Sequence, residues 1–266
     1  MPLISSRQNP VVRAFRTLAR DADPDGSRLL LDGAHLIRDA CDAGVELEMV
    51  AVSAGRGSGT EEAELARSLQ TRGTQVIAAT AQAFGAMTPV RAPSGIVAIA
   101  RRTPTGLETI CAHPHAFVIV AVDVQDPGNV GALIRSAEAA GATGVVVCGA
   151  SANPFSWKAV RGSMGSILRL PVAARSDVAT ALRGFRQAGG HVVAAVARGG
   201  QTPDEIDWRG RVAIVVGGEG PGLAEDALAQ ADALVTIPMA PPVESLNVAM
   251  AAAVLVYAAR RQRQAP

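Results

Sequence analysis

The residues with the clearest chemical potential in this sequence lie in three loops, each of which follows an apolar run and leads into a helix-like segment. The first loop, in VDVQDPGNVGALIRSAEAAG, holds Asn129 and Arg135 among small side chains. The second, in VVGGEGPGLAEDAL, places Glu219 inside a run of glycines. The third, in IPMAPPVESLNVAMAAAVLV, carries Ser245 and Asn247 between prolines and an Ala/Val run. Small neighbours leave room for a ligand to approach these polar groups.

Each loop also has a structural explanation that involves no ligand. The DPGN segment is typical of a helix start, and the glycine run is typical of a tight turn between a strand and a helix. In the third loop, Ser245 or Glu244 would serve as the helix N-cap. That assignment leaves Asn247 unexplained, because it would lie inside the first turn, where Asn is a poor helix former. Arg135 is also unexplained, since its helix otherwise consists of Ala, Leu, Ile and Gly nearby.

The glycine spacing excludes two common nucleotide-binding loops. VVGGEGPGL does not match GxGxxG and lacks the GK[ST] ending of a phosphate-binding loop. A carboxylate at Glu219 suits an arginine partner, or a neutral or cationic ligand, better than a phosphate. VDVQDPGNVGALI has the wrong glycine spacing for a dinucleotide-binding dehydrogenase, and the glycine-rich loop of an ordinary, unknotted methyltransferase is missing.

The elements that must position these loops form a regular alternation in the second half of the chain. Continuous β-branched runs alternate with helical segments, which predicts a parallel sheet covered on both faces. The predicted strands are HAFVIVAVDV, TGVVVCG, HVVAAVA, RVAIVVGG and ALVTIPM. Ligands of such sheets bind at the carboxyl ends of the strands, where all three loops begin.

The first hundred residues predict a separate, smaller α/β domain. Residues 10–20 form an amphipathic helix, with Val11, Phe15 and Leu18 on one face. Strand and helix patterns then alternate as far as GIVAIARR, and RRTPTGL is typical of a linker. We therefore expect an α/β domain over residues 1–101, a linker over 102–107 and a larger domain over 108–266.

Composition restricts the classes of function. The 266 residues are 48% hydrophobic but only 3% aromatic, and the net charge of +1 gives no global basic field, so any nucleic-acid contact must be local. Cys41, Cys111 and Cys148 are scattered with no CxxC, which predicts reduced thiols in a cytoplasmic protein and no metal site. The longest apolar run, residues 248–259, is shorter than the ~20 residues of a membrane-spanning helix, and the N-terminus lacks the apolar core of a signal peptide.

Taken together, NVGALIRSAEAAG, VVGGEGPGL and IPMAPPVESLNVAMAAAVLVYAARR resemble the three motifs of the SpoU (TrmH-type) RNA ribose methyltransferases of the SPOUT superfamily. Their order and spacing match over residues 115–262. KAVRGSMGSILRLPV resembles a further family stretch, and SSRQNPVVRAFRTLAR with RLLLDGAHLIRDA resembles the family's N-terminal substrate-binding domain. The resemblance implies methyl transfer from S-adenosylmethionine to a ribose 2′-hydroxyl, a C-terminal trefoil knot, and a homodimer with its site near the interface.

The family's functional residues can be carried over one by one. The resemblance implies catalytic roles for Asn129, Arg135, Glu219, Ser245 and Asn247. It implies cofactor binding by Gly217, Gly218, Glu219, Gly220, Ile237, Met239, Ser245 and Leu246. One departure is Gly218, which stands where many relatives carry Asn, so we expect a backbone cradle and no side-chain contact there.

The family's arginine is proposed to act as the base that deprotonates the hydroxyl. Neutralising an arginine at pH 7 costs roughly 7–9 kcal/mol. We therefore expect Arg135 to hold the target's phosphate and to favour the ionised hydroxyl by its charge.

The RNA target is not encoded in any motif. Six basic residues are candidate phosphate contacts: Arg7, Arg13, Arg16, Arg20, Lys158 and Arg161. By analogy with the family, the N-terminal domain favours ribosomal RNA as the substrate. The alternatives are a tRNA 2′-O-methyltransferase, and an RNA-binding protein with a catalytically inactive methyltransferase fold.

Overall fold

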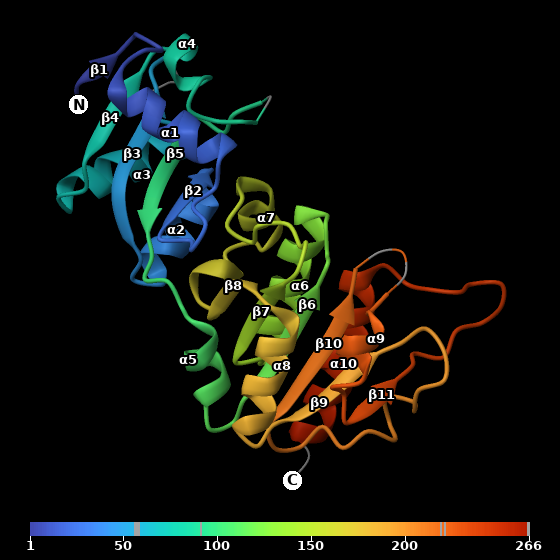
Figure 1. Ribbon diagram of the computed structural model, residues 1–266. Coiled ribbons are helices and arrows are strands. Elements are labelled where there is room, and N and C mark those ends of the chain that lie inside the picture. The colour runs from blue at the N-terminus through green and yellow to red at the C-terminus, as the bar shows by residue number, and fades with distance from the viewer. Residues whose placement is uncertain (56–58, 91, 219, 221, 265–266) are drawn as a thin grey trace. The chain divides into compact units, whose positions relative to one another are not determined.

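Two sheets organise the chain, one in each of the two units into which its contacts divide it (Figure 1). The computed structural model describes residues 1–264 except 56–58, 91, 219 and 221. The first unit comprises Met1–Thr103 together with Phe155–Arg169. The second comprises Pro104–Pro154 and the residues from Leu170 onward.

The first unit is built on a mixed five-stranded sheet in the order β1-β4-β3-β5-β2. Its strands are β1 (Leu3–Ile4), β2 (Arg28–Asp32), β3 (Glu46–Ser53), β4 (Val76–Ala79) and β5 (Ile96–Arg101), with β5 antiparallel to both of its neighbours. Its helices are α1 (Pro10–Arg20), α2 (Ala34–Asp42), α3 (Glu61–Thr71), α4 (Ala81–Phe84) and α7 (Trp157–Gly162), followed by the short 3₁₀ turn η1 (Ser166–Leu168). The smaller α/β fold expected for the N-terminal part is confirmed.

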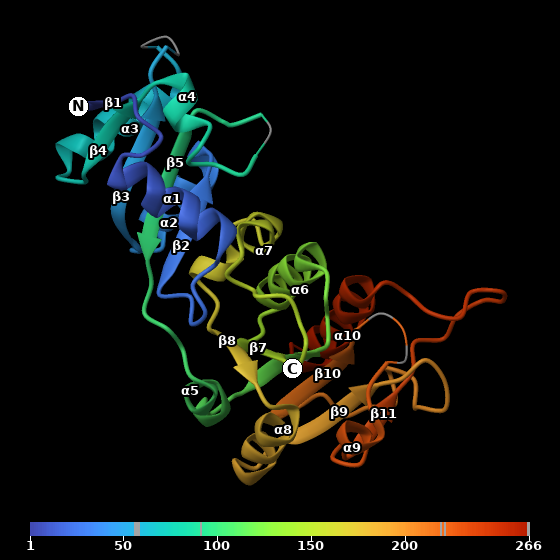
Figure 2. The same ribbon diagram turned by 45° about the horizontal axis from the view of Figure 1, so that its top comes forward.

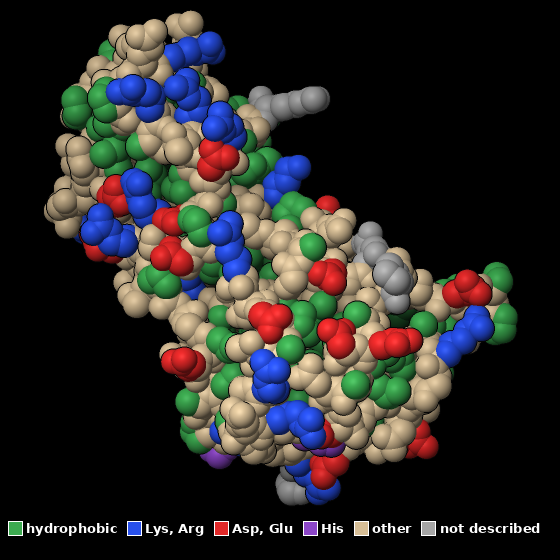
Figure 3. All heavy atoms as spheres, viewed as in Figure 1, with side chains coloured by type: hydrophobic (Ala, Val, Ile, Leu, Met, Phe, Trp, Pro, Cys, Tyr) green, Lys and Arg blue, Asp and Glu red, His purple; other side chains and the backbone are tan. Residues whose placement is uncertain are grey.

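Helix α1 has the amphipathic character that its sequence predicts. Asn9 caps it by accepting a hydrogen bond from the Val11 amide at 2.9 Å, and Pro10 occupies the first turn, where its missing N–H costs nothing. Val12, Phe15 and Leu18 are buried in the core of the unit, so Val12 takes the central place expected for Val11. The three helix arginines are exposed, and Lys and Arg side chains gather over α1 in Figure 3.

Helix α7 and its flanking residues were not predicted as part of the first unit. Trp157 packs against the same core as Phe15. The Phe155 ring lies beneath the Arg102 guanidinium, 4.9 Å from its centroid. A Cβ on Gly26 would approach this ring to 2.5 Å, which explains the glycine there. The segment that follows β7 therefore belongs with the N-terminal residues in its packing.

The second unit is built on a six-stranded sheet in the order β11-β9-β10-β6-β7-β8, in which every pairing is parallel. Its strands are β6 (Phe117–Val122), β7 (Gly144–Cys148), β8 (Val172–Ser176), β9 (His191–Ala195), β10 (Val212–Gly217) and β11 (Ala233–Val235). Its helices are α5 (Leu107–Ala112), α6 (Pro127–Ala139), α8 (Val178–Gln187), α9 (Glu225–Leu228) and α10 (Val248–Arg263). The predicted parallel α/β domain is confirmed, whereas α5 and β8 were not anticipated.

Helices cover both faces of the parallel sheet (Figures 1 and 2). Val118, Val120 and Val122 of β6 point into a core shared with α5 and α8. Helices α6 and α10 pack on each other over the opposite face, where α10 contacts β10. No helix in the described part of the chain is long and apolar enough to cross a membrane. The trefoil knot implied by the resemblance stays a prediction.

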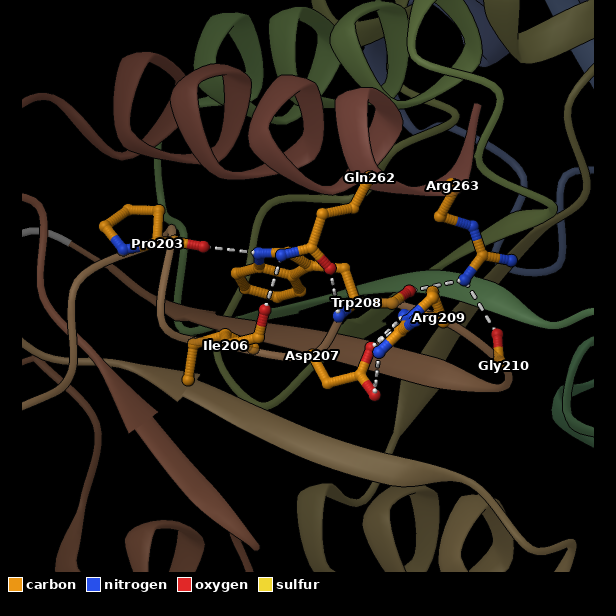
Figure 4. A network of polar contacts seen from close by, with 8 residues as sticks. All are labelled: Pro203, Ile206, Asp207, Trp208, Arg209, Gly210, Gln262 and Arg263. Carbon is orange, nitrogen blue, oxygen red and sulfur yellow. Dashed lines mark hydrogen bonds and ion pairs between the residues drawn. The ribbon is translucent and has the colours of Figure 1, made fainter. Parts of the chain in front are cut away.

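The C-terminal end of α10 is tied to the segment before β10 by a polar network (Figure 4). The Trp208 side chain is completely buried, and its Nε1 donates to the Pro203 carbonyl at 2.7 Å. The Gln262 amide accepts from the Trp208 backbone N–H at 3.0 Å and donates to the Ile206 carbonyl at 2.8 Å. Arg263 Nη1 donates to the carbonyls of Trp208 and Gly210, each at 2.7 Å. This network fixes where α10 ends.

Replacing Arg263 should therefore destabilise the protein. Arg263→Met removes two charge-assisted hydrogen bonds to backbone carbonyls, one of them partly buried, so we expect the free energy of unfolding to fall by about 1–3 kcal/mol. Urea unfolding followed by circular dichroism measures the change. Arg261→Met is the matched control, because Arg261 lies on the same helix and makes only an exposed ion pair with Asp204, worth less than about 1 kcal/mol. Equal losses for the two variants would contradict the role given to the network.

Candidate functional site

A cavity of about 530 Å³ opens where β9, β10 and β11 end at their carboxyl edges. This volume is in the range of small-molecule sites. The strand ends, the glycine loop after β10, the loop after β11 and the start of α10 form its walls. Its lining residues are Ala195, Val196, Ala197, Val216, Gly217, Gly218, Gly220, Gly222, Leu223, Leu228, Val235, Ile237, Met239, Ser245, Leu246, Asn247, Val248 and Ala251.

Most of the residues expected to bind a cofactor lie in these walls. They are Gly217, Gly218, Gly220, Ile237, Met239, Ser245 and Leu246. Glu219, expected in both the cofactor and the catalytic sets, lies outside the described residues. Asn247 is the second predicted catalytic residue, after Ser245, that lines the cavity.

Gly217 and Gly218 are required by close approaches of other backbone segments. A Cβ on Gly218 would lie 1.9 Å from the Asp123 carbonyl oxygen, and one on Gly217 would lie 2.8 Å from the Gly222 carbonyl carbon. Both distances are far below van der Waals contact, so neither position admits a side chain. The Gly218 amide also donates to the Val122 carbonyl at 2.7 Å, which continues the pairing of β10 with β6. Bare backbone therefore forms this part of the wall.

Asn247 joins the third loop to the first. Its Oδ1 accepts from the amides of Ala249 at 3.0 Å and Met250 at 3.4 Å, which makes Asn247 the N-cap of α10. The capping bonds aim its Nδ2 at Asn129 Oδ1, 3.1 Å away. The expectation that Ser245 or Glu244 caps this helix is wrong, because the helix starts later and Asn is itself a strong cap.

Asn129 is held by the cap of its own helix. Asp126 Oδ1 accepts from the Asn129 amide at 2.8 Å, and Pro127 begins α6. The two asparagines therefore meet where two capped helix N-termini converge. The sequence suggested only that Asp126 belongs to the start of a helix. In the structure, this capping role is what positions Asn129.

Arg135 lies apart from the cavity. Its side chain is exposed on α6, does not line the cavity, and makes no hydrogen bond or ion pair with the residues that the structure describes. Its side chain is therefore accessible at the surface of α6. Glu244, which does not cap α10, forms an ion pair with Arg198 at 3.0 Å. Both residues line a second cavity of about 630 Å³, which shares Ala197, Ile237 and Met239 with the first.

Two other chemistries find little support among the described residues. Burial raises the pKa of the Cys148 thiol to about 12, with Asp177 and Asp123 adding to the effect, so this thiol is not a nucleophile at neutral pH. Within the described ranges, no group of three His, Cys, Asp or Glu side chains could hold a metal ion.

The predicted RNA contacts all fall in the first unit. Arg7, Arg13, Arg16, Arg20, Lys158 and Arg161 are all exposed. Arg7 donates to the Gln82 carbonyl at 3.3 Å, Arg20 pairs with Asp21, and the Lys158 ammonium lies 5.7 Å from the centre of the Trp157 ring. These are weak surface contacts that leave the charges accessible.

Comparisons with known proteins agree with one another and with the resemblance found in the sequence. The profile of the SpoU rRNA Methylase family matches residues 116–257. The chain is 32% identical to an uncharacterised tRNA/rRNA methyltransferase from Synechocystis, over 98% of this chain and 94% of that one. It is 30% identical to the 23S rRNA (guanosine(2553)-2′-O)-methyltransferase RlmP of Bacillus subtilis, over 97% and 98%. An AdoMet-bound rRNA methyltransferase from Sinorhizobium meliloti superimposes with a TM-score of 0.84 at 29% identity, covering 97% of each chain.

The two contacts of Asn247 can be separated by substitution. Asn247→Asp keeps the capping oxygen but loses the donor to Asn129, whereas Asn247→Ala loses both. We expect Asn247→Ala to lower the free energy of unfolding by about 1 kcal/mol and Asn247→Asp to leave it unchanged or raised, since a negative charge suits a helix N-terminus. Urea unfolding is the measurement. Asn9→Ala, which removes a similar cap from α1, calibrates the cost of a lost cap. An Asp variant as unstable as the Ala variant would mean that capping is not the role of Asn247.

Proposed function

Because the chain belongs to the SpoU rRNA Methylase family, we propose that it transfers a methyl group from S-adenosylmethionine to a ribose 2′-hydroxyl of RNA. The observation that carries this proposal is the hydrogen bond from Asn247 to Asn129 at the mouth of the 530 Å³ cavity. It joins the first and third sequence motifs beside a wall made by the second. Three motifs distant in sequence thus converge on one site.

The cavity suits S-adenosylmethionine. Ile237, Leu246 and Leu223 offer apolar surface for a flat nucleobase, while the glycine loop offers backbone groups at positions where side chains are excluded. Met239 and Ser245 complete the wall beside Leu246. When bound, the cofactor supplies a methyl group that is already activated on a sulfonium. The protein's task is then to hold the acceptor hydroxyl in line with it.

Arg135 is the residue that we assign to the RNA side of the reaction. Its exposed guanidinium can form a paired contact with a backbone phosphate of the target. A positive charge beside the ribose also stabilises the ionising hydroxyl. Since Arg135 does not line the cavity, this role is independent of cofactor binding.

The asparagine pair and its neighbours would orient the ribose. Asn129 and Asn247 hold each other's amides, so their remaining polar atoms have fixed directions. Ser245, two residues before Asn247, also lines the cavity. We assign Glu219, by the resemblance, to the orientation of the ribose and Arg135.

We propose ribosomal RNA as the substrate, in preference to tRNA. The similarity to a 23S rRNA methyltransferase over almost the whole chain supports this choice. The exposed basic residues of the first unit would bind the phosphates of the target, with Arg13, Arg16 and Lys158 as examples. We also propose a cytoplasmic location, which three free cysteines support.

We further propose a homodimer formed through α10. One face of this helix packs on α6 and β10, but Met250, Val254 and Tyr257 are 64%, 44% and 51% exposed. Their spacing places them along one stripe of the helix. An exposed apolar stripe of this kind favours burial by a partner.

The methylation proposal is tested with the purified protein, tritiated S-adenosylmethionine and total RNA. We expect label in ribosomal RNA, and mapping of alkali-resistant linkages would identify a 2′-O-methylated nucleotide. Arg135→Ala should lower the methylation rate at least a hundredfold while calorimetry gives a cofactor dissociation constant within about threefold of wild type. Asn129→Ala should lose more than tenfold in rate.

Three results would contradict this assignment. Equal loss of cofactor binding and turnover in Arg135→Ala would mean that Arg135 also serves the cofactor and does not act on the RNA alone. Label found only in tRNA would mean that tRNA, and not ribosomal RNA, is the substrate. Cofactor binding without labelled RNA would favour an RNA-binding protein with an inactive methyltransferase fold.

The dimer is tested by Val254→Glu. A charge in the exposed stripe of α10 should convert a dimeric protein to a monomer, because burying it against a partner is unfavourable. Sedimentation equilibrium gives the mass. Gln187→Glu, on the exposed surface of α8, adds the same charge elsewhere and should leave the dimer intact. A monomeric wild-type protein would refute the proposed dimer.

A further inference from the structure

Asp123 follows the last residue of β6 in a conformation that few residues with side chains adopt. Its φ angle is +56°, in the left-handed region. Asp and Asn enter this region more readily than other residues, because their short polar side chains can bond locally. Asp123 does not line the cavity, and neither the sequence motifs nor the proposed reaction gives it a role.

The loop after β7 fixes this turn. The Ala150 amide donates to Asp123 Oδ1 at 2.7 Å. Ser151 Oγ accepts from the Val124 amide at 2.9 Å and donates to the Cys148 carbonyl at 2.7 Å. Asp123 and Val124, which follow β6, are therefore both held by the loop after β7. Gly149 permits the arrangement, because a Cβ there would lie 2.3 Å from Asp123 Oδ1.

The turn at Asp123 also contacts the wall of the cavity. It directs the Asp123 carbonyl at Gly218, where the oxygen lies only 1.9 Å from the place of an added Cβ. Gly217 and Gly218 are wall residues of the cavity, so the Asp123 peptide lies directly against that wall. Three residues further along, Asp126 caps α6 and holds the Asn129 amide. The segment 123–126 thus contacts the glycine loop at Asp123 and caps α6 at Asp126.

We propose that Asp123 is a positioning residue for methyl transfer. Its left-handed turn, fixed by the Ala150 amide, holds the Gly217–Gly218 wall at the distance from Asn129 that cofactor and ribose require. The inference rests on the proposed function, since it takes the cavity to be the cofactor site. Asp123 acts through the backbone of Gly218 and touches neither substrate.

Three substitutions separate the two properties of Asp123. Asp123→Asn keeps both the tolerance for positive φ and an oxygen that can accept from Ala150. Asp123→Gly keeps only the backbone freedom. Asp123→Ala keeps neither. Calorimetry should give dissociation constants for S-adenosylmethionine within about twofold of wild type for Asn, raised about threefold for Gly, and raised tenfold or more for Ala.

Arg175→Ala is the matched control. Arg175 also has a positive φ of +58°, lies in β8 at the edge of the same sheet, and lines no part of the cavity. The variant also places an Ala at a positive φ in the same sheet, but at a position outside the cavity lining. We expect cofactor affinity to weaken in Asp123→Ala and to stay unchanged in Arg175→Ala, while the melting temperature of each variant reports the effect on the fold itself.

Each outcome of this experiment decides something. Unchanged affinity in Asp123→Ala, equal affinities for the Asn and Ala variants, or equal weakening in Arg175→Ala would overturn the role of Asp123. Should Asp123→Ala fail to fold, the Gly variant decides, because wild-type affinity there contradicts the proposal. Absence of cofactor binding in the wild-type protein would refute the proposed function itself.

Discussion

The hydrogen bond between Asn247 and Asn129 joins the two helix starts on which the site depends. Each amide group has a fixed direction because a helix cap controls it: Asn247 caps α10 with its own oxygen, and Asp126 caps α6 by holding the Asn129 amide. The two helices pack on each other along the same face of the sheet, so their N-termini meet at its carboxyl edge. Two local helix caps thereby position a hydrogen bond between residues that are 118 positions apart in the sequence.

Small side chains make this convergence feasible. Ala249, Ala252 and Ala259 are buried along α10, where larger residues would hold the helix away from α6 and β10. At the other end of the helix, Gln262 and Arg263 bond to backbone groups and set its position along its axis. A chain with 3% aromatic residues relies on such close approach and on buried polar anchors, since it has few large side chains with which to fill space.

The sequence was informative where local chemistry decides the structure. The strand runs around Val120 and Val215 and the helix face with Phe15 lie as their periodicity predicts. The glycine loop was also placed correctly beside Ile237 and Leu246, because parallel strands put their carboxyl ends at one edge. Sequence reasoning failed where distant segments compete. Asn247 was placed inside a helix that it caps, and nothing near Trp157 indicates that its ring belongs to the first unit's core. Asp123 was overlooked, because a left-handed turn at an Asp has no pattern that distinguishes it in one sequence.

The anchoring of α10 has a consequence for the order in which the protein is made. Arg263 also reaches the carbonyl of His115, 148 positions earlier, and its guanidinium lies 4.9 Å from the centre of the Phe117 ring. A nascent chain emerging from the ribosome therefore has β6 and the first motif long before it has the helix that completes the site. Until residues 247–263 have been made, the part of this face that α10 covers, including β10, stays exposed, and Asn129 lacks its contact with Asn247. Synthesis of α10 is thus the step that completes the pocket.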